Sequence, residues 1–420
     1  MRADAGKPTH LDSIPGFPNM SDAPVATAAY QHSLSPRLTL VFAIASGFSV
    51  ANIYYAQPLI GLIAPALHLP ATLAGLIMTL VQLGYGAGLL LLVPLADVVE
   101  NRKLIGMLLG GMVLGLLGTA AATSAATFLV AAFMVGVCAT AAQILLPFAS
   151  HLAPEASRGK VVGNVMGGLL TGVMLARPFA SFVAATLGWR AIFLISAGAT
   201  LLLIGVLLRV LPQRRPDSGH SYKRILLSLG GLLRDTPLLR RRAFYQGMMF
   251  AAFHVFWTGS PLLLTHAFGY GQQGIALFAL VGAAGALAAP WAGRMADRGL
   301  TRRVTGLAMA SVVFAFGLTA LATALHSIAL LVLAALLLDA AVQTCGVLSL
   351  RSLYMMAPQL RGRLNGLFMT SIFVCGAFAS GLSAALYVLH GWNALAGLGT
   401  AFGVLALLVY ASEFRRTAAD

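Results

Sequence analysis

The chain has 420 residues, of which 59% are hydrophobic and only 9% charged. Because about a quarter of the residues in soluble domains are charged, this composition excludes a large water-soluble core. The net charge of +15 is compatible with a nucleic-acid partner until the positions of the charges are considered.

The N-terminal segment, residues 1–36, contains Pro, His, Ser and Asp without a long apolar run. Neither a cleavable signal sequence nor a membrane span has this composition. We therefore expect a flexible cytoplasmic tail.

Twelve membrane spans are predicted in the rest of the chain. A helix needs roughly 20 apolar residues to cross the hydrocarbon, so each of four uncharged stretches holds two spans with a turn between them, and four shorter apolar segments hold one each. Helices are favoured over a barrel because these segments are continuously apolar and lack a two-residue alternation. The double stretches run over residues 38–96, 104–154, 243–293 and 364–412, and the single ones over 161–186, 191–211, 304–324 and 328–350.

The longest polar interruption, residues 212–242, divides the spans into six and six. Its segment Tyr222–Leu233 places apolar residues near one helical face, which is typical of an interfacial helix on an anionic membrane surface; a plain solvated linker is the alternative. The predicted domains are an N-terminal six-helix bundle, a cytoplasmic linker with an amphipathic helix, a C-terminal six-helix bundle and a cytoplasmic tail, over residues 37–211, 212–242, 243–412 and 413–420.

The basic residues are confined to one side of this topology. Of the 27 Lys and Arg residues, all but Arg177 and Arg190 lie in the inner loops and tails. This positive-inside bias predicts a bacterial inner-membrane protein with both termini in the cytoplasm. It also attributes the basic charge to topology, so that no nucleic-acid partner is needed.

The two halves are related by an internal repeat. From an Arg-Gly pair onward the offset between matching residues stays at 203, and an Asp followed by a basic pair recurs earlier in each half. Two rocking bundles in a transporter require such a parallel repeat. The matches include Arg158-Gly159 with Arg361-Gly362, Gly188-Trp189 with Gly391-Trp392, and Asp97 with Asp297.

The loop after the eighth predicted span carries the strongest motif, Gly293-Arg294-Met295-Ala296-Asp297-Arg298-Gly299 followed by the basic pair Arg302-Arg303. On this motif the chain resembles the major facilitator superfamily over residues 38–414. The resemblance implies two six-helix bundles and a loop that stabilises the state closed to the cytoplasm; the alternative is that these charges only fix topology. The first copy of the motif is degenerate, with Val93 and Glu100 at glycine positions. The predicted gate residues are Asp97, Arg102 and Lys103 in the first copy, and Gly293, Asp297, Arg298, Gly299, Arg302 and Arg303 in the second.

Residues 51–58 of the first span and 175–178 of the fifth resemble the drug:proton antiporter-like branch of that family. In the fifth span Gly168 and Gly172 fit the antiporter pattern, but Arg177-Pro178 stands where the pattern has Gly-Pro. This departure weakens the expectation of export.

Two charged residues lie clearly inside spans, Asp339 in the tenth and Arg177 in the fifth. Such groups are costly in the bilayer and tend to face a cavity, pair or carry protons. We expect Asp339 to be a protonatable or cation-binding carboxylate. Burial favours its protonated form and a nearby cationic substrate opposes protonation, so proton and substrate can be exchanged. Arg177 would be a fixed charge for a carboxylate, a carbonyl group or an anionic substrate. A structural carboxylate bonded to a neighbouring helix is the alternative for Asp339.

Further polar and aromatic residues on the first, fourth, seventh and tenth spans are weaker candidates for substrate binding or proton coupling. Each could instead be an interhelical hydrogen-bonding or packing residue. They are Asn52, Tyr54, Tyr55, Gln57, Gln143, His254, Trp257 and Gln343.

These observations predict a secondary active transporter that works as a monomer, a proton-coupled exporter of small amphipathic or drug-like compounds. An uptake symporter or facilitator of the same fold is the alternative. No Walker motif, paired-His zinc motif or serine elbow is visible, so we expect no enzyme activity, cofactor or metal. A membrane enzyme would need its His, Asp, Glu or Ser residues at one membrane level, and the nine His residues are scattered.

Overall fold

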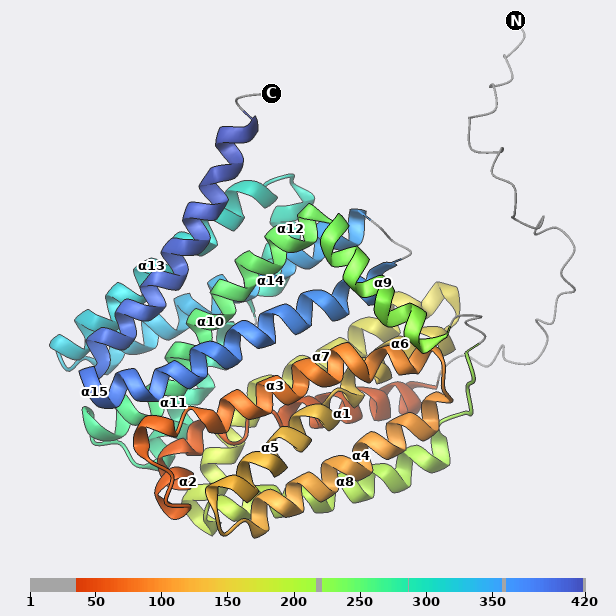
Figure 1. The fold of residues 1–420 in the computed structure, drawn as a ribbon, viewed down its shortest axis with the longest axis horizontal. Coiled ribbons are helices and arrows are strands. Elements are labelled where there is room, and N and C mark those ends of the chain that lie inside the picture. Colours follow the sequence, from red (N-terminus) through yellow and green to blue (C-terminus); the bar gives the residue numbers. More distant parts are fainter. Residues whose placement is uncertain (1–34, 217–220, 286, 357–359, 418–420) are drawn as a thin grey trace, which may run out of the picture.

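The computed structural model describes residues 35–216, 221–285, 287–356 and 360–417, and all the regular structure in these ranges is helical. The predicted tail over residues 1–36 therefore lies almost wholly outside the described residues, as do residues 418–420. Figure 1 shows an elongated bundle in which the N-terminal half, in red to yellow-green, lies beside the C-terminal half, in green to blue.

The N-terminal half begins with a broken span. Helix α1 (Pro36–Ala51) ends in a turn, after which the 3-10 helix η1 (Gln57–Leu59) and α2 (Ile60–Ala66) continue the crossing. Pro58 near the start of η1 and Pro65 inside α2 interrupt regular hydrogen bonding here. The rest of this half consists of η2 (Ala71–Leu73), α3 (Leu76–Leu91), η3 (Val93–Asp97), α4 (Asn101–Ala121), α5 (Ala125–Ala139), α6 (Ala141–Leu152), η4 (Glu155–Ser157), α7 (Arg158–Leu187) and α8 (Trp189–Val210).

The C-terminal half begins with α10 (Pro237–His266), whose first turns include Arg240, Arg241 and Arg242. The second crossing of this half, the eighth of the chain, is divided between α11 (Gln272–Gly285) and α12 (Ala288–Asp297). The remaining helices are α13 (Thr301–Ala324), α14 (Ile328–Met356) and α15 (Arg361–Thr417).

The described helices account for twelve crossings. Nine helices in the described ranges are long and apolar enough to span a membrane. The longest, Arg361–Glu413, contains two crossings joined at a kink at Gly391, and the divided pairs α1–α2 and α11–α12 supply the other two. The predicted all-helical membrane fold with twelve spans is confirmed.

Matching glycines show the repeat in three dimensions. Gly188, between α7 and α8, has φ 83°, and Gly391, at the kink of α15, has φ 74°. Non-glycine residues rarely adopt this left-handed region. The tryptophans that follow, Trp189 and Trp392, are both buried, so the two halves use the same corner between their last two spans.

Helices α1 and α7 approach each other through glycines. A Cβ atom at Gly172 would lie 2.1 Å from the carbonyl oxygen of Gly47, and one at Gly168 would lie 2.5 Å from that of Ala43. Only glycine allows this approach, which is common between membrane helices. The packing fixes α7, and thereby Arg177, against the first span.

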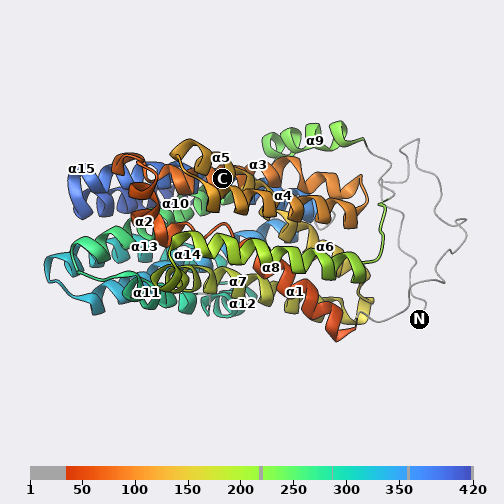
Figure 2. The same cartoon turned by 90° about the horizontal axis from the view of Figure 1, so that it is seen from below.

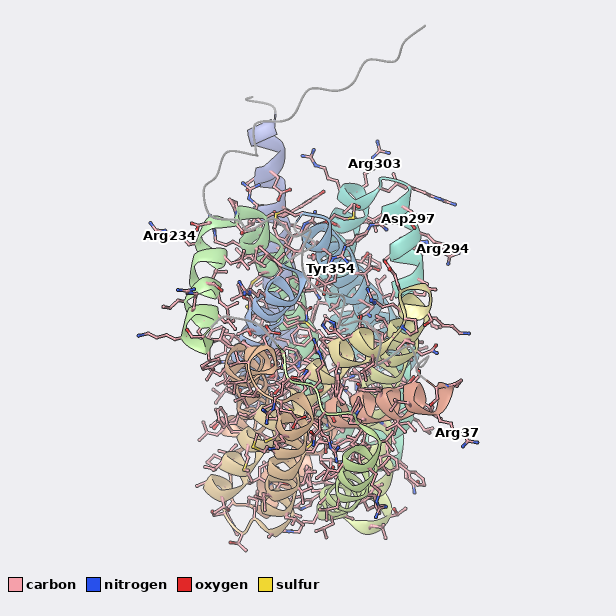
Figure 3. The ribbon with its side chains drawn as sticks, turned by 90° about the vertical axis from the view of Figure 1, so that its right-hand side faces the viewer. Arg37, Arg234, Arg294, Asp297, Arg303 and Tyr354 are labelled. Carbon is pink, nitrogen blue, oxygen red and sulfur yellow. The ribbon has the colours of Figure 1, made fainter. Side chains whose placement is uncertain are left out.

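We name the two ends of the bundle by their residues. The basic end carries the loops around Arg102, Arg158, Arg302 and Arg361, and the loop end carries Gly188, Gly269 and Gly391. Figure 3 looks onto the basic end, where Arg37, Arg234, Arg294 and Arg303 lie around the rim.

The halves pack against each other along two helix pairs, α3 with α15 and α7 with α11. At the loop end η1 and α2 also contact α10, and η2 contacts α15. In contrast, the main partners of α6 and α14 belong to their own halves. The half interface is therefore most extensive from the centre of the bundle towards the loop end.

Helix α9 (Tyr222–Asp235) lies across the basic end, at the edge of the bundle in Figure 2. Its Ile225 and Leu229 are buried against the bundle, and the Tyr222 hydroxyl donates to the carbonyl of Leu91 over 2.6 Å. The apolar face of this amphipathic helix thus packs on protein, while Leu227 remains exposed.

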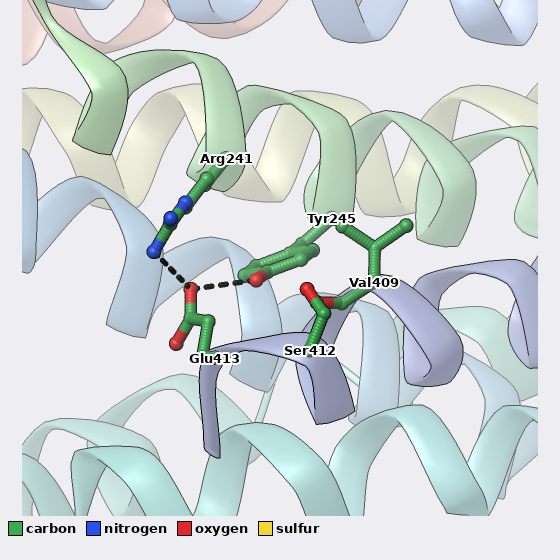
Figure 4. A network of polar contacts seen from close by, with 5 residues as sticks. All are labelled: Arg241, Tyr245, Val409, Ser412 and Glu413. Atoms are coloured by element: carbon green, nitrogen blue, oxygen red, sulfur yellow. Dashed lines mark hydrogen bonds and ion pairs between the residues drawn. The ribbon is translucent and has the colours of Figure 1, made fainter. Parts of the chain in front are cut away.

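The last helix is tied to α10 at the basic end. Figure 4 shows Glu413 between Tyr245, whose hydroxyl donates to its carboxylate over 2.6 Å, and Arg241, whose Nη1 lies 3.7 Å away. This network holds the end of α15 against the start of the second half.

Candidate functional site

Five of the predicted site residues meet where the two halves join: Tyr54, Gln57, Arg177, Trp257 and Asp339. We call this group the central cluster. All five side chains are buried. They come from the turn between α1 and η1, from η1, and from α7, α10 and α14, which cross the middle of the bundle in Figure 1.

The cluster lies at mid-depth. Arg177 lies ten residues before the end of α7, and Asp339 lies eleven residues after the start of α14. At a rise of 1.5 Å per residue both lie about 15 Å from the loop end. That is about half the thickness of a bilayer's hydrocarbon core.

Arg177 is held by one hydrogen bond and three aromatic rings. Its Nε donates to Oε1 of Gln57 over 2.7 Å. Its guanidinium carbon lies 4.9 Å from the ring centre of Tyr54, 5.0 Å from that of Phe253 and 4.8 Å from that of Trp257. Cation–π contacts of this kind strengthen when water is excluded.

Trp257 connects the two charges of the cluster. Its indole Nε1 donates to Oδ1 of Asp339 over 2.8 Å, while the same ring lies beside Arg177. Among the described residues the ion pairs are Arg241–Glu413 and Arg351–Asp297, both at the basic end. Arg177 and Asp339 therefore act on each other through their fields, with Trp257 in contact with both.

Two glycines of α11 make room for the Asp339 carboxylate. A Cβ atom at Gly282 would lie 2.6 Å from the Trp257 ring and 2.8 Å from Oδ2 of Asp339, and one at Gly285 would lie 2.3 Å from Cβ of Asp339. Helix α11 also packs on α7. A movement of α7 against α11 would therefore reach Asp339.

A chain of polar side chains extends from the cluster across the half interface. Nε2 of Gln57 donates to the Thr258 hydroxyl over 3.5 Å, and that hydroxyl lies 3.4 Å from the Ser380 hydroxyl. Ser380 accepts a 2.9 Å hydrogen bond from Nε2 of Gln82. This chain links α10 and α15 of one half with η1 and α3 of the other.

Sequence reasoning missed Phe253, Thr258, Ser380 and Gln82. Phe253 lies four residues before Trp257 and so on the same helical face. Ser380 matches Arg177 at the repeat offset of 203. Phe253 and Ser380 could therefore have been identified from the sequence, whereas no pattern in the sequence distinguishes Gln82 and Thr258.

Three buried polar atoms at the cluster and next to it have no hydrogen-bond partner in the described part of the chain: Nη2 of Arg177, Nε2 of His254 and Oε1 of Gln82. The other ring nitrogen of His254 lies 3.0 Å from the carbonyl oxygen of Phe250, within its own helix. A buried polar atom that has no partner in the protein is able to bind a polar group of a ligand, an ion or a water molecule.

The other residues predicted on the first, fourth and tenth spans lie outside the cluster. Asn52 accepts a 2.6 Å hydrogen bond from Ser196 of α8. Gln143 donates to the Tyr85 hydroxyl over 3.1 Å. Gln343 is partly exposed on α14, one turn beyond Asp339.

Tyr55 lines an apolar groove of about 840 Å³ between α1, α7 and α11. Exposed apolar side chains of the spans, including Leu40, Phe179 and Leu277, form its walls. The groove therefore faces the membrane rather than the central cluster.

In the first copy of the loop motif, Glu100 caps α4. Its carboxylate accepts from the backbone amides of Arg102 and Lys103 at 3.0 and 3.2 Å. Arg102 donates to the carbonyls of Leu208 and Leu211 at the end of α8. Among the charged groups near Asp97, Arg363 of the other half has the largest electrostatic influence on it, followed by Arg214 and His151.

In the second copy, Asp297 forms a 2.6 Å ion pair with Arg351 of α14, which also donates to the carbonyl of Gly293. Gly299 has φ 75°, a conformation that explains glycine at this position. Arg298, Arg302 and Arg303 are exposed at the rim.

Comparison with known proteins points to one family. The sequence model of the Major Facilitator Superfamily matches residues 42–313. An uncharacterized transporter of Escherichia coli O157:H7, YgaY, is 38% identical over 391 residues, with 92% of this chain and 98% of the relative covered. A probable transporter of Streptomyces coelicolor, SCO4007, is 33% identical, with 87% and 85% covered.

The fold is similar to solved transporter structures. A D-xylose-proton symporter matches with a TM-score of 0.71 at 16% identity, over 89% of this chain and 96% of that one. The human organic anion transporter MFSD10 matches with a TM-score of 0.64 at 18% identity, over 90% and 100%. At these identities the likeness shows the fold.

Proposed function

Because the chain belongs to the Major Facilitator Superfamily, we propose that this secondary transporter is proton-coupled, carries small amphipathic compounds, and uses the central cluster as its site. Asp339 carries the proton. The observation that supports this most is a single buried carboxylate at mid-depth, bonded to Trp257 and within the field of Arg177. Every other Asp and Glu of the sequence lies outside the predicted spans or at their ends.

The working cycle follows from where the two charges lie. Asp339 and Trp257 belong to the second half, and Gln57 and Arg177 to the first. Rocking of the halves changes the distance between the Trp257–Asp339 pair and Arg177. A proton on Asp339 removes its attraction to the guanidinium, so protonation favours one arrangement over the other.

The charged loops at the basic end support the gate predicted there. Asp297 and Arg351 pair within the second half, while Asp97 of the first half is influenced by Arg363 of the second. We propose that these loops bias the equilibrium between the two conformations. We also propose that the basic end faces the cytoplasm, as the positive-inside rule predicts.

Export is the direction that the sequence predicts, and the aromatic rings of the cluster suit small amphipathic compounds. Uptake is the second candidate, and one observation favours it. Arg177 lies in the same cluster as Asp339, and a fixed cation disfavours the cationic compounds that a carboxylate would exchange for protons.

The test is accumulation of a panel of cationic, neutral and anionic compounds in energised cells that overproduce the protein. We expect wild type to change accumulation of at least one compound, a protonophore to abolish the change, and Asp339→Asn at matched abundance to abolish it too. Asp235→Asn removes an exposed carboxylate at the basic end and should behave as wild type. A protonophore-sensitive change that persists in Asp339→Asn would exclude Asp339 as the proton carrier.

A further inference from the structure

The guanidinium of Arg177 has an unused donor. The side chain is only 4% exposed, its Nε is bonded to Gln57, and its flat faces lie near aromatic rings. Nη2 has no partner in the described part of the chain. Since an unpaired charged donor in a buried site is costly, the geometry points to a group that is bound there during part of the cycle.

The group that fills this place must suit the charges around it. Besides Arg177, the titratable side chains at the cluster are Asp339 on α14, Tyr54 beside η1 and His254 on α10, and each is within the electrostatic influence of Arg177. Asp339 is the one that can balance the guanidinium, and Trp257 already occupies its Oδ1. With Asp339 ionised the charges of Arg177 and Asp339 cancel; with Asp339 protonated one positive charge remains.

We propose that the substrate carries an anionic group, a carboxylate or sulfonate, which binds Nη2 of Arg177 together with one proton on Asp339. This inference rests on the proposed function and names its substrate class. Arg177 matches such groups because its planar donors fit two acceptor oxygens. The empty site with ionised Asp339 and the loaded site with proton and anion then have the same charge.

Charge balance also sets the mode of coupling. An anion beside Asp339 favours protonation of that carboxyl, and by reciprocity the proton favours the anion. Proton and substrate are therefore carried in the same direction, so the inward proton gradient drives uptake. A cationic substrate would displace the proton instead and be exchanged for it. The inference thus favours the uptake alternative over export.

The experiment uses the purified full-length protein in detergent and three probes with one aromatic ring: benzenesulfonate, benzyl alcohol and benzylamine. Affinity is measured by calorimetry between about pH 5 and about pH 8, where perturbed carboxyls titrate, and proton uptake is measured in weakly buffered solution. We expect benzenesulfonate to bind best, with affinity rising about tenfold for each pH unit of acidification above the titration of Asp339. We expect one proton to be taken up for each anion bound.

Variants assign these effects to residues. Arg177→Gln should lose benzenesulfonate binding, and Arg177→Lys should recover part of it. Asp339→Asn should bind benzenesulfonate at every pH as wild type does at low pH. Arg190→Gln removes an arginine that stacks on Trp189 with its carbon 4.2 Å from the ring centre, and it should leave binding unchanged. Thermal unfolding of each variant separates loss of binding from loss of fold.

Two outcomes would overturn the inference: absence of benzenesulfonate binding to the folded wild type, or tighter binding of benzylamine or benzyl alcohol. If benzylamine bound best, more tightly at high pH, and lost this pH dependence in Asp339→Asn, coupling through Asp339 would stand and only the anionic substrate class would fail. If no probe showed pH-dependent binding that Asp339→Asn removes, the proposed function would fail as well.

Discussion

The two halves of the bundle are built alike but carry different chemistry at matching positions. Arg177 on α7 and Ser380 on α15 are related by the repeat offset of 203. Both are buried, and both lie where the halves meet. Arg177 holds a fixed charge in its aromatic surroundings, whereas Ser380 accepts a neutral hydrogen bond from Gln82. The repeat gives both halves the same helix packing at this position, and the arginine in the first copy supplies the buried positive charge of the central cluster.

The negative charge opposite to Arg177, that of Asp339, lies in the other half. Asp339 has no ionisable counterpart inside the spans of the first half, whose carboxylates are at loops and helix ends. Each half therefore contributes one member of a charge pair, separated by Trp257. Protonation of Asp339 would weaken its attraction to Arg177 across this interface, and the arrangement of the two halves could then change.

Removing Arg177 should have the largest effect on transport. Arg177→Gln leaves the buried Asp339 carboxylate without the opposite charge that acts on it, and it removes the guanidinium that we propose binds the substrate. We expect transport to fall by about 100-fold. The measurement is initial transport rate at matched abundance, with Arg190→Gln as the control; a rate within twofold of wild type would contradict this role.

Trp257→Phe keeps an aromatic ring beside Arg177 and removes the indole donor to Asp339. The 2.8 Å bond to Asp339 would be lost, at a cost of about 2 kcal/mol for a hydrogen bond to a charged group. We expect the pH at which the transport rate is half-maximal to shift. Binding of the substrate at Arg177 should change little. Trp291→Phe, which alters a partly exposed tryptophan on α12, is the matched control. An unchanged pH profile of transport would show that the hydrogen bond from Trp257 to Asp339 has no part in proton coupling.

Gly282→Ala tests the space that α11 leaves for the carboxylate. The added Cβ would lie 2.8 Å from Oδ2 of Asp339 and 2.6 Å from the Trp257 ring, so both side chains must shift, at a cost of about 1 kcal/mol. We expect a lower transport rate and a modest decrease in the thermal unfolding temperature. Gly317→Ala on α13, where a Cβ would meet nothing within 4 Å, should have neither effect.

The smallest effect is expected at the basic end. Asp297 and Arg351 pair at 2.6 Å, but their side chains are 67% and 39% exposed, and exposed pairs contribute about 0.5 kcal/mol. Asp297→Asn should change transport by no more than about threefold, less at high salt. A complete loss of transport would mean that the loop does more than bias the two conformations.

The spans could be predicted from the sequence because hydropathy and charge are local properties. Contacts between spans are not local, so the cluster itself was not predictable. Asn52, Tyr54, Tyr55 and Gln57 illustrate this: they lie at the break after α1, and the turn sends their side chains in different directions. Asn52 bonds to α8 and Tyr55 lines the outer groove, while Tyr54 and Gln57 reach Arg177.

Tertiary context also explains the departures from the family's loop pattern. Glu100 stands where glycine is expected in the first copy because it caps α4. Val93, at the other glycine position, lies in the 3-10 helix η3. In the first copy Glu100 thus acts as a helix cap, and in the second copy Gly299 has a left-handed backbone conformation.

We propose that Asp339 takes up the coupling proton, and infrared difference spectroscopy tests this without a substrate. Spectra of the purified protein are recorded while the pH is lowered from about 8 to about 5, a range in which buried carboxyls titrate. We expect a carbonyl band of a newly protonated carboxyl in wild type that is absent from Asp339→Asn and retained in Asp235→Asn. Identical difference spectra for wild type and Asp339→Asn would contradict it.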